Sequence, residues 1–194
     1  MASLEDIITS KVRIKVIEVF FANPKEMYHV RGLVREVKEE INAVRRELSR
    51  LETAGLLKKE TRGNRIYYWP REDYPMYGDL ISLVAKTKGL GGDLINNKTK
   101  IGKPAFVMFS GRFARFEKRK KEDDVDILVV GEIVLPELAT LIRAEESKRG
   151  HEINYTVMSR EELDFRKKRR DPFIQGVLSN SRIMVIGDED ALVS

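Results

Sequence analysis

Apolar residues in the first third of the chain recur at helical spacing, in three successive stretches. The first begins after Ser10, a residue type that caps helices, and ends at Asn23-Pro24. The second covers residues 28–37 and the third about residues 40–54, and Gly55 follows where glycine commonly ends a helix. The apolar positions of the third stretch are Ile41, Val44, Leu48 and Leu51. This spacing predicts three amphipathic helices.

After residue 55 the apolar pattern changes to that of β-strands. Residues 56–57 and 66–69 are rich in leucine, isoleucine and aromatic side chains. Between them lies Thr61-Arg-Gly-Asn64, which is typical of a hairpin turn with glycine at its bend. Three helices followed by a β-hairpin is the element order of a winged helix-turn-helix domain.

The sequence of these first seventy or so residues resembles the arsenic-repressor-type (ArsR) regulators. It is more similar still to small prokaryotic regulators that join such a domain to a minimal nucleotidyltransferase. The matching stretches are Ala43-Val-Arg-Arg-Glu-Leu48, Leu51-Glu-Thr-Ala-Gly-Leu-Leu57 and Arg62-Gly-Asn-Arg-Ile-Tyr-Tyr68. The resemblance implies a winged helix that binds double-stranded DNA.

Polar and basic residues of the third predicted helix lie off its apolar stripe, and others lie at the hairpin tip. Side chains of these types contact base edges and phosphates when a recognition helix enters the major groove and a wing touches the backbone. The alternative is that they form the solvated face of an amphipathic helix. The predicted DNA-binding residues are Asn42, Arg45, Arg46 and Arg50 on the helix, with Ser49 as an alternative to Arg50, and Arg62, Asn64 and Arg65 on the hairpin.

In the second half of the chain, two short apolar runs flank a charged loop. Residues 106–109 and 127–130 have the composition of buried strands, and the basic run 118–121 lies between them. Because residues i and i+2 of a strand share a face, Asp124 and Asp126 should lie side by side with the intervening valine in the core. Two adjacent carboxylates repel each other unless they share a cation, and oxygen ligands of this kind suit Mg²⁺.

This second half resembles the minimal nucleotidyltransferases of the DNA polymerase β superfamily. Gly111 matches the turn glycine of that family, and Phe113-Ala-Arg115 matches the residues that follow it. Asp124 and Asp126 match the metal-binding pair, and Leu128-Val-Val-Gly131 matches the strand after the pair.

The resemblance implies a nucleotide site as well as a fold. Asp124 and Asp126 would be catalytic residues that bind Mg²⁺, with Glu152 as a third carboxylate from a neighbouring strand. Gly111, Arg112 and Arg115 would contact a nucleoside triphosphate. Arg112 stands where the family has serine, which predicts weakened catalysis. Arg112 would either bind phosphate itself or pair with Asp124. A basic residue from the run 118–121 is the other candidate for a counterion that takes the place of the metal.

The remaining pattern completes an α+β chain. Helices are expected over residues 135–149, from residue 160 and over 172–178, with strands over 152–158 and 182–186. The predicted organisation is a winged helix-turn-helix domain at 1–73, a helical connector at 74–92 and a nucleotidyltransferase-like α/β domain with a mixed sheet at 93–194.

Composition narrows the classes of function. Apolar residues make up 42% of the chain and charged residues 35%, which is typical of a globular protein. There is no cysteine, so disulfides and thiolate chemistry are excluded. No apolar run is long enough to cross a membrane and no signal-peptide pattern is present, so a cytoplasmic protein is expected. The net charge of +5 permits nucleic-acid binding.

These observations predict a DNA-binding transcriptional regulator with a nucleotidyltransferase-like domain of reduced activity. One alternative is an active Mg²⁺-dependent nucleotidyltransferase that modifies a protein or a small molecule. Another is an antitoxin-type subunit that acts through protein interactions. A homodimer is expected in the first case, because such domains read two half-sites, and apolar residues 80–84 are the predicted interface.

Overall fold

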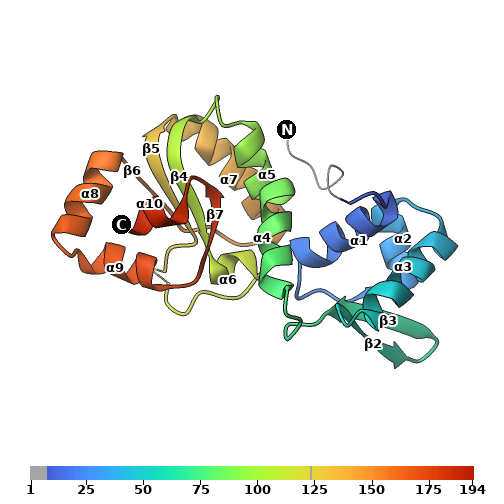
Figure 1. Cartoon of the computed structure of the whole chain (residues 1–194). Helices are drawn as coiled ribbons and strands as arrows, with labels where there is room; N and C mark the ends of the chain where they lie inside the picture. The colour runs from blue at the N-terminus through green and yellow to red at the C-terminus, as the bar shows by residue number, and fades with distance from the viewer. Residues whose placement is uncertain (1–7, 123) are drawn as a thin grey trace. The chain divides into compact units, whose positions relative to one another are not determined.

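The computed structural model describes residues 8–122 and 124–194 of the chain (Figure 1). It is α+β, with one three-stranded and one four-stranded sheet. The chain divides into two compact units, Met1–Lys88 and Gly89–Ser194, and each is described by itself. Every helix in the described residues is too short or too polar to cross a lipid bilayer.

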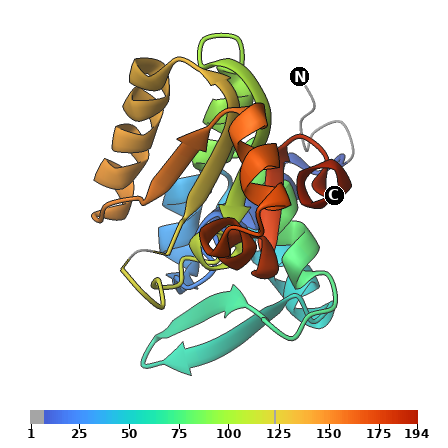
Figure 2. The ribbon, with the colours of Figure 1, turned by 90° about the vertical axis from the view of Figure 1, so that its left-hand side faces the viewer.

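The first unit packs four helices against a small antiparallel sheet. Its elements are α1 (Lys11–Ala22), β1 (Tyr28–His29), α2 (Val30–Val37), α3 (Ile41–Thr53), β2 (Leu57–Arg62), β3 (Arg65–Pro70) and α4 (Tyr77–Thr87). The strand order is β1-β3-β2. Strands β2 and β3 form a long hairpin that pairs as far as Arg62 and Arg65 (Figure 2).

The helices predicted over the first third of the chain are present, with one shift. Ser10 caps α1 by accepting a hydrogen bond from the Arg13 amide, and Gly55 follows α3 with a φ of +78°. The predicted helix over residues 28–37 starts two residues later, because Tyr28 and His29 pair with β3 instead. The imidazole Nδ1 of His29 accepts a 2.9 Å hydrogen bond from the Gly32 amide and so caps α2.

Helix α4 belongs to the first unit, although the sequence suggested a connector. Ile81 and Val84 are buried, and the helix packs on α1. The side chains that α1 buries are Ile14, Val16, Ile17, Phe20 and Phe21. The apolar residues of α1 and α4 therefore belong to one core. The boundary between the two units accordingly falls after Lys88.

The second unit is built on a mixed sheet with helices on both faces (Figure 1). Its elements are α5 (Gly89–Asn96), β4 (Gly102–Ser110), α6 (Gly111–Ala114), β5 (Ile127–Ile133), α7 (Leu135–Arg149), β6 (Tyr155–Met158), α8 (Arg160–Lys168), α9 (Pro172–Ser179), β7 (Arg182–Ile186) and α10 (Glu189–Val193). The strand order is β6-β5-β4-β7. Strands β5 and β6 are parallel, and the other two pairs are antiparallel.

Strand alternation distributes the apolar residues of this sheet between two cores. Phe106, Met108, Leu128 and Val130 contact Leu163 of α8, Ile174 of α9 and Leu192 of α10. The intervening strand residues face the opposite way. There Phe109 meets Phe113 of α6 edge to face, with ring centroids 5.1 Å apart, and α5 packs on α7. The sheet is therefore the middle of three layers.

Strand ends differ from the sequence-based expectation at three places. Strand β5 continues through Gly131, which has a φ of +141° and whose added Cβ would lie 2.4 Å from the carbonyl oxygen of Lys103. Strand β6 starts at Tyr155, so Glu152 precedes it. Asp124 and Asp126 likewise precede β5. Both carboxylates of the predicted pair are thus on a loop, where strand alternation does not fix their directions.

Candidate functional sites

Helix α3 presents a polar face opposite its buried face. Val44, Leu48 and Leu51 are buried. The predicted DNA-binding residues of this helix, Asn42, Arg45, Arg46 and Arg50, are exposed, as is Ser49. The guanidinium groups of Arg45 and Arg46 form no ion pair with any described residue. Arg50 lies 4.0 Å from Glu47.

The β2–β3 hairpin carries the other predicted DNA-binding residues at its tip. Arg62, Asn64 and Arg65 are all exposed. Arg62 pairs with Glu60 at 2.8 Å, and its guanidinium lies 5.7 Å from the centroid of the Tyr67 ring. Strand β2 contacts α3, so the hairpin and the helix belong to one packed unit.

Two acidic residues fix the position of α3. Glu47 is buried, and its carboxylate accepts a 2.5 Å hydrogen bond from Arg13 of α1. This hydrogen bond is the largest of the influences that raise the pKa of Arg13. At the start of α3, Glu40 accepts hydrogen bonds from the amides of Asn42 and Ala43, which lowers the pKa of the Glu40 carboxyl. The exposed face of α3 is therefore held by contacts on its other sides.

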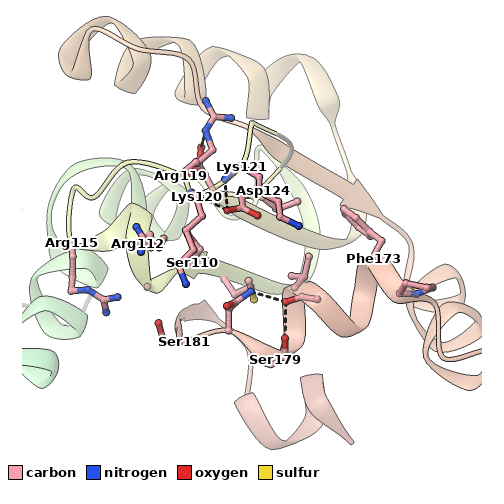
Figure 3. A pocket seen from close by; sticks show the side chains of 18 residues that line it. Ser110, Arg112, Arg115, Arg119, Lys120, Lys121, Asp124, Phe173, Ser179 and Ser181 are labelled. Atoms are coloured by element: carbon pink, nitrogen blue, oxygen red, sulfur yellow. Dashed lines mark hydrogen bonds and ion pairs between the residues drawn. The ribbon is translucent and has the colours of Figure 1, made fainter.

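The second unit contains a cavity of about 560 Å³ between the loop after β4 and helix α9 (Figure 3). It brings together most of the residues predicted for the nucleotide site. Five cationic side chains line it, together with both predicted aspartates. The lining residues that bear on function are Gly111, Arg112, Arg115, Arg119, Lys120, Lys121, Asp124, Asp126, Phe173 and Ser181. Val125 also lines the cavity, so the prediction that it enters the core is wrong.

Asp124 is committed to its own loop. One carboxylate oxygen, Oδ2, accepts hydrogen bonds of 3.0 Å from the backbone amides of Lys120 and Lys121. The backbone carbonyl of Asp124 accepts a 3.1 Å bond from the side-chain amide of Asn154. Asp124 therefore organises the loop as well as lining the cavity.

Asp126 is buried and has a cationic partner. Its Oδ2 lies 3.7 Å from Nε of Arg119 and accepts a 3.0 Å hydrogen bond from the Asn154 amide. Burial is the largest influence and raises the pKa of Asp126, while the Asn154 bond and Arg119 oppose it. Arg119 also donates a 3.1 Å hydrogen bond to the backbone carbonyl of Glu152.

The structure does not bring the Glu152 carboxylate to the aspartates. Glu152 is exposed, does not line the cavity, and contributes its carbonyl rather than its carboxylate. Asn154, two residues later, is the neighbour that contacts both Asp124 and Asp126. An amide at this position supplies hydrogen bonds but no third negative charge.

The residues predicted to bind nucleotide surround a tight turn. An added Cβ on Gly111 would lie 2.2 Å from Oγ of Ser181, so only glycine fits beside that segment. Arg112 donates a 2.9 Å hydrogen bond to the carbonyl of Lys118 and lies 3.7 Å from Glu117. Arg115 pairs with Glu117 at 3.0 Å. Arg112 and Asp124 do not form an ion pair. The cation beside the two carboxylates is Arg119, which pairs with Asp126.

The turn after β4 is anchored to α7 by a buried arginine. The guanidinium of Arg149 lies 3.9 Å from the ring centroid of Phe113 and 3.8 Å from that of Phe116. It pairs with Glu145 at 2.8 Å and donates a hydrogen bond to the Phe113 carbonyl. Burial lowers the pKa of Arg149, and Glu145 raises it.

These contacts bear on whether Mg²⁺ fits the site. Asp126 is paired with Arg119, and the Oδ2 atom of Asp124 is occupied by two amides. Within residues 8–122 and 124–194, no three His, Cys, Asp or Glu side chains are grouped as a metal site requires. The arrangement therefore does not fit Mg²⁺ unless Arg119 leaves Asp126.

Sequence reasoning considered Asn154 only as an uncharged residue on the same face as Glu152, and it did not single out Arg119 or Phe173. Arg119 lies within a basic run whose members look alike in the sequence. Phe173 is at the second position of α9. It lines the same cavity as the two aspartates although it is far from them along the chain, so the sequence contains no sign of this.

No protein-family model and no curated protein matches this chain. A solved structure of human N-acetylserotonin methyltransferase in complex with SAM is similar to it at 15% identity with a TM-score of 0.31. The alignment covers 89% of this chain and 45% of the methyltransferase, so the chain spans less than half the length of that enzyme. A TM-score this low does not indicate a shared fold, and nothing about the methyltransferase is carried over.

Proposed function

We propose that this chain is a transcriptional regulator that binds duplex DNA through α3 and the β2–β3 hairpin, in the manner of a winged helix. Its second unit would be a nucleotidyltransferase-like sensor with reduced catalytic activity. One observation carries the DNA-binding part. Arg45 and Arg46 are exposed on the polar face of α3 and form no ion pair with a described residue.

The absence of partners within the described residues matters energetically. An arginine that already pairs with a carboxylate must lose that pair before it neutralises a phosphate. Arg45 and Arg46 form no such ion pair within the described residues, although both lie close enough to Glu40 to lower the pKa of its carboxyl, and each phosphate that they contact releases a condensed counterion. The buried side of α3 and the Arg13–Glu47 pair keep the same face outward in the free protein. This surface therefore needs little reorganisation to meet a duplex.

The test is a titration of a random-sequence 30-base-pair duplex, measured by fluorescence anisotropy over a range of salt concentrations. Arg45→Ala plus Arg46→Ala should weaken binding at least about tenfold at low salt and reduce the salt slope by about 2. The control is Arg143→Ala plus Arg169→Ala, which removes two exposed arginines of the second unit. Equal affinity of the two double variants, with unchanged circular dichroism, would exclude α3 as the DNA-binding surface.

The second unit also supports an enzymatic candidate. Asp124 and Asp126 line the same cavity as Arg112 and Arg115, which is the grouping expected for a Mg²⁺-dependent nucleotidyltransferase. Arg119 on Asp126 favours reduced activity over full activity. An active enzyme and a weakened one are distinguished by incubating the protein with labelled nucleoside triphosphates, Mg²⁺ or Mn²⁺, and cell lysate. Metal-dependent label transfer that disappears in Asp124→Asn would establish the enzyme.

A homodimer is part of the proposal, because two half-sites require two copies of α3. Within the predicted interface at residues 80–84, Ile81 and Val84 are used for packing inside the unit. Leu80 and Leu83 are only half-buried and are the residues left to form an interface. Light scattering at micromolar concentration should give a dimer mass, and Leu80→Glu plus Leu83→Glu should give a monomer. A monomeric wild-type protein would contradict this part alone.

A further inference from the structure

The loop of residues 118–122 folds back over the two aspartates of the second unit. Arg119 reaches Asp126 at 3.7 Å and the Glu152 carbonyl at 3.1 Å. The next two residues, Lys120 and Lys121, give their amides to Asp124. The chain thus supplies its own positive groups at the place where a metal ion would otherwise balance two carboxylates.

This arrangement leaves the cavity with an excess of positive charge. Five cationic side chains and two carboxylates line it, and Glu117 next to the lining supplies a third negative charge, so an excess of two positive charges remains. Arg112 and Arg115 share Glu117. The ammonium groups of Lys120 and Lys121 are exposed and form no ion pair with any residue in the described ranges. They are the cations most available to an incoming anion.

The opposite side of the cavity is apolar and aromatic. Phe173, at the start of α9, is 40% exposed, and Met108 and Val177 lie in the same lining. In Figure 3, Phe173 lies at one end of the labelled side chains and Arg115 at the other, with Lys120, Lys121 and Asp124 between them. A ligand that satisfies both sides must carry several negative charges and a flat apolar ring, and a volume of about 560 Å³ suits a molecule of nucleotide size.

We infer that this cavity binds a nucleoside polyphosphate without a divalent cation, with Arg119 as the built-in counterion of Asp126. The phosphates lie against Lys120 and Lys121, and the base stacks on Phe173. This inference rests on the proposed sensor role of the second unit and names the class of its ligand. It departs from Mg²⁺-dependent nucleotide binding, because Arg119 pairs with one of the carboxylates that would bind the metal and two backbone amides occupy an oxygen of the other.

The first measurement is the affinity of the full chain for ATP by calorimetry, in EDTA and in MgCl₂ at equal ionic strength. ATP should bind in EDTA at least as tightly as in MgCl₂, since no metal bridges the phosphates to the protein and Mg²⁺ bound to ATP neutralises charge that the lysines would otherwise contact. Binding that is lost in EDTA, or no binding in either buffer, would overturn the inference.

The charges of Lys120 and Lys121 and the aromatic ring of Phe173 are then tested separately, each with a matched control variant. Lys120→Gln plus Lys121→Gln should weaken ATP binding about tenfold or more. Lys98→Gln plus Lys100→Gln removes two exposed lysines of the same unit outside the cavity lining and should have little effect. Equal losses in both double variants would mean that ATP follows only the net charge of the unit.

Phe173→Ala should weaken ATP binding about tenfold and leave tripolyphosphate binding unchanged, because only ATP has a base to stack. Phe165→Ala is the control, since Phe165 is 55% exposed but does not line the cavity. If Phe173→Ala weakened the binding of ATP and of tripolyphosphate equally, the base would not stack on Phe173. The site would then bind polyphosphates in general, and the assignment of a nucleotide ligand would be wrong.

Arg119→Gln tests the built-in counterion directly. Removal of the guanidinium should expose the carboxylates and create Mn²⁺ binding, observed by electron paramagnetic resonance, that the wild type lacks. Mn²⁺ binding of equal strength in both proteins would overturn the role of Arg119. DNA binding is measured on the same samples, so failure here with DNA binding intact contradicts only this inference, whereas loss of the Arg45 and Arg46 effect contradicts the proposed regulator.

Discussion

The two units use their arginines in opposite ways. In the first unit, Arg45 and Arg46 are exposed on α3 and form no ion pair with a described residue. In the second unit, Arg119 pairs with Asp126, and Arg149 is buried between two phenylalanine rings. The same residue type is therefore an exposed cation without an ion pair to any described residue in one unit and the partner of a buried carboxylate in the other.

This difference indicates how each unit meets a ligand. A surface of free arginines can bind a polyanion at once, and the strength of that binding depends on salt. A cavity whose arginines already have partners offers an anion mainly its lysines. The two units have similar shares of basic residues. They differ in whether these arginines already form ion pairs with carboxylates.

The largest expected effect of a single substitution is on the buried cation of the second unit. The side chain of Arg149 is 9% exposed, and its partner Glu145 is equally buried. Arg149→Ala leaves that carboxylate without its closest partner and removes both ring contacts. We expect a loss of about 3–5 kcal/mol in the free energy of unfolding, measured by urea denaturation with far-ultraviolet circular dichroism.

The control for that variant is Lys103→Ala in the same unit. Lys103 pairs with Glu132 at 3.2 Å, but the two side chains are 84% and 79% exposed. Its removal should change the free energy of unfolding by less than about 0.5 kcal/mol. Similar losses for Arg149→Ala and Lys103→Ala would mean that burial does not determine the worth of these pairs.

The next effect is smaller because the cation is closer to solvent. Arg13 is 36% exposed and pairs with buried Glu47. Arg13→Ala should cost about 2 kcal/mol, less than full burial would give, because water reaches the guanidinium. Trp69 is the one tryptophan of the chain and lies in the first unit, so its fluorescence during urea unfolding reports the change.

Restoration by a second substitution identifies the cause. In Arg13→Ala the Glu47 carboxylate remains buried with Arg50 only 4.0 Å away. Replacing it as well, by Glu47→Leu, should recover most of the lost stability, since no charge is then left buried. If the double variant is no more stable than Arg13→Ala, the loss arises from packing of the Arg13 side chain instead.

The smallest expected effect concerns the pH dependence of stability. Burial raises the pKa of Asp126, so the folded chain holds this proton more tightly than the unfolded chain does. Stability from this group is greatest below the usual aspartate pKa of about 4 and decreases as the pH rises through the folded pKa. Asp126→Asn should remove that decrease while keeping an oxygen acceptor for the Asn154 amide.

Urea denaturation of both proteins at a series of pH values from 4 to 7 measures this. The difference in stability between wild type and Asp126→Asn should shift in favour of the variant as the pH rises. Asp79→Asn, an exposed aspartate of the first unit, is the control. A difference that is constant with pH would show that Arg119 fully compensates the burial of Asp126.

Much of the local structure could be predicted from the sequence. Ser10 and Gly55 marked helix ends, and residues 135–149 gave a helix with the bounds that the structure has. These features depend on nearest neighbours along the chain, through caps, glycine conformations and the spacing of apolar residues, and so the linear pattern contains them.

The candidate site was predicted only in part. The aspartates, Gly111 and the basic loop were identified, and the cavity does contain them. A basic residue of the loop was a candidate partner of the aspartates, but Arg119 could not be told from its similar neighbours. Phe173 was missed because it lies about fifty positions along the chain from Asp124. Glu152 was chosen on the expectation of a longer strand, and the start of β6 at Tyr155 places its carboxylate elsewhere.

The sequence by itself determined most of the helices and strands, apart from several of their ends, and where charge is concentrated. Only the tertiary structure decided which charges are free. Arg45 and Arg119 have the same intrinsic chemistry, and pairing depends on whether the folded chain places a carboxylate beside the guanidinium. Helix α3 packs by its apolar side and leaves Arg45 in water, whereas the loop after β4 returns to the sheet and brings Arg119 to a buried carboxylate. Burial and proximity, which no linear pattern encodes, leave one arginine exposed in water and make the other a counterion.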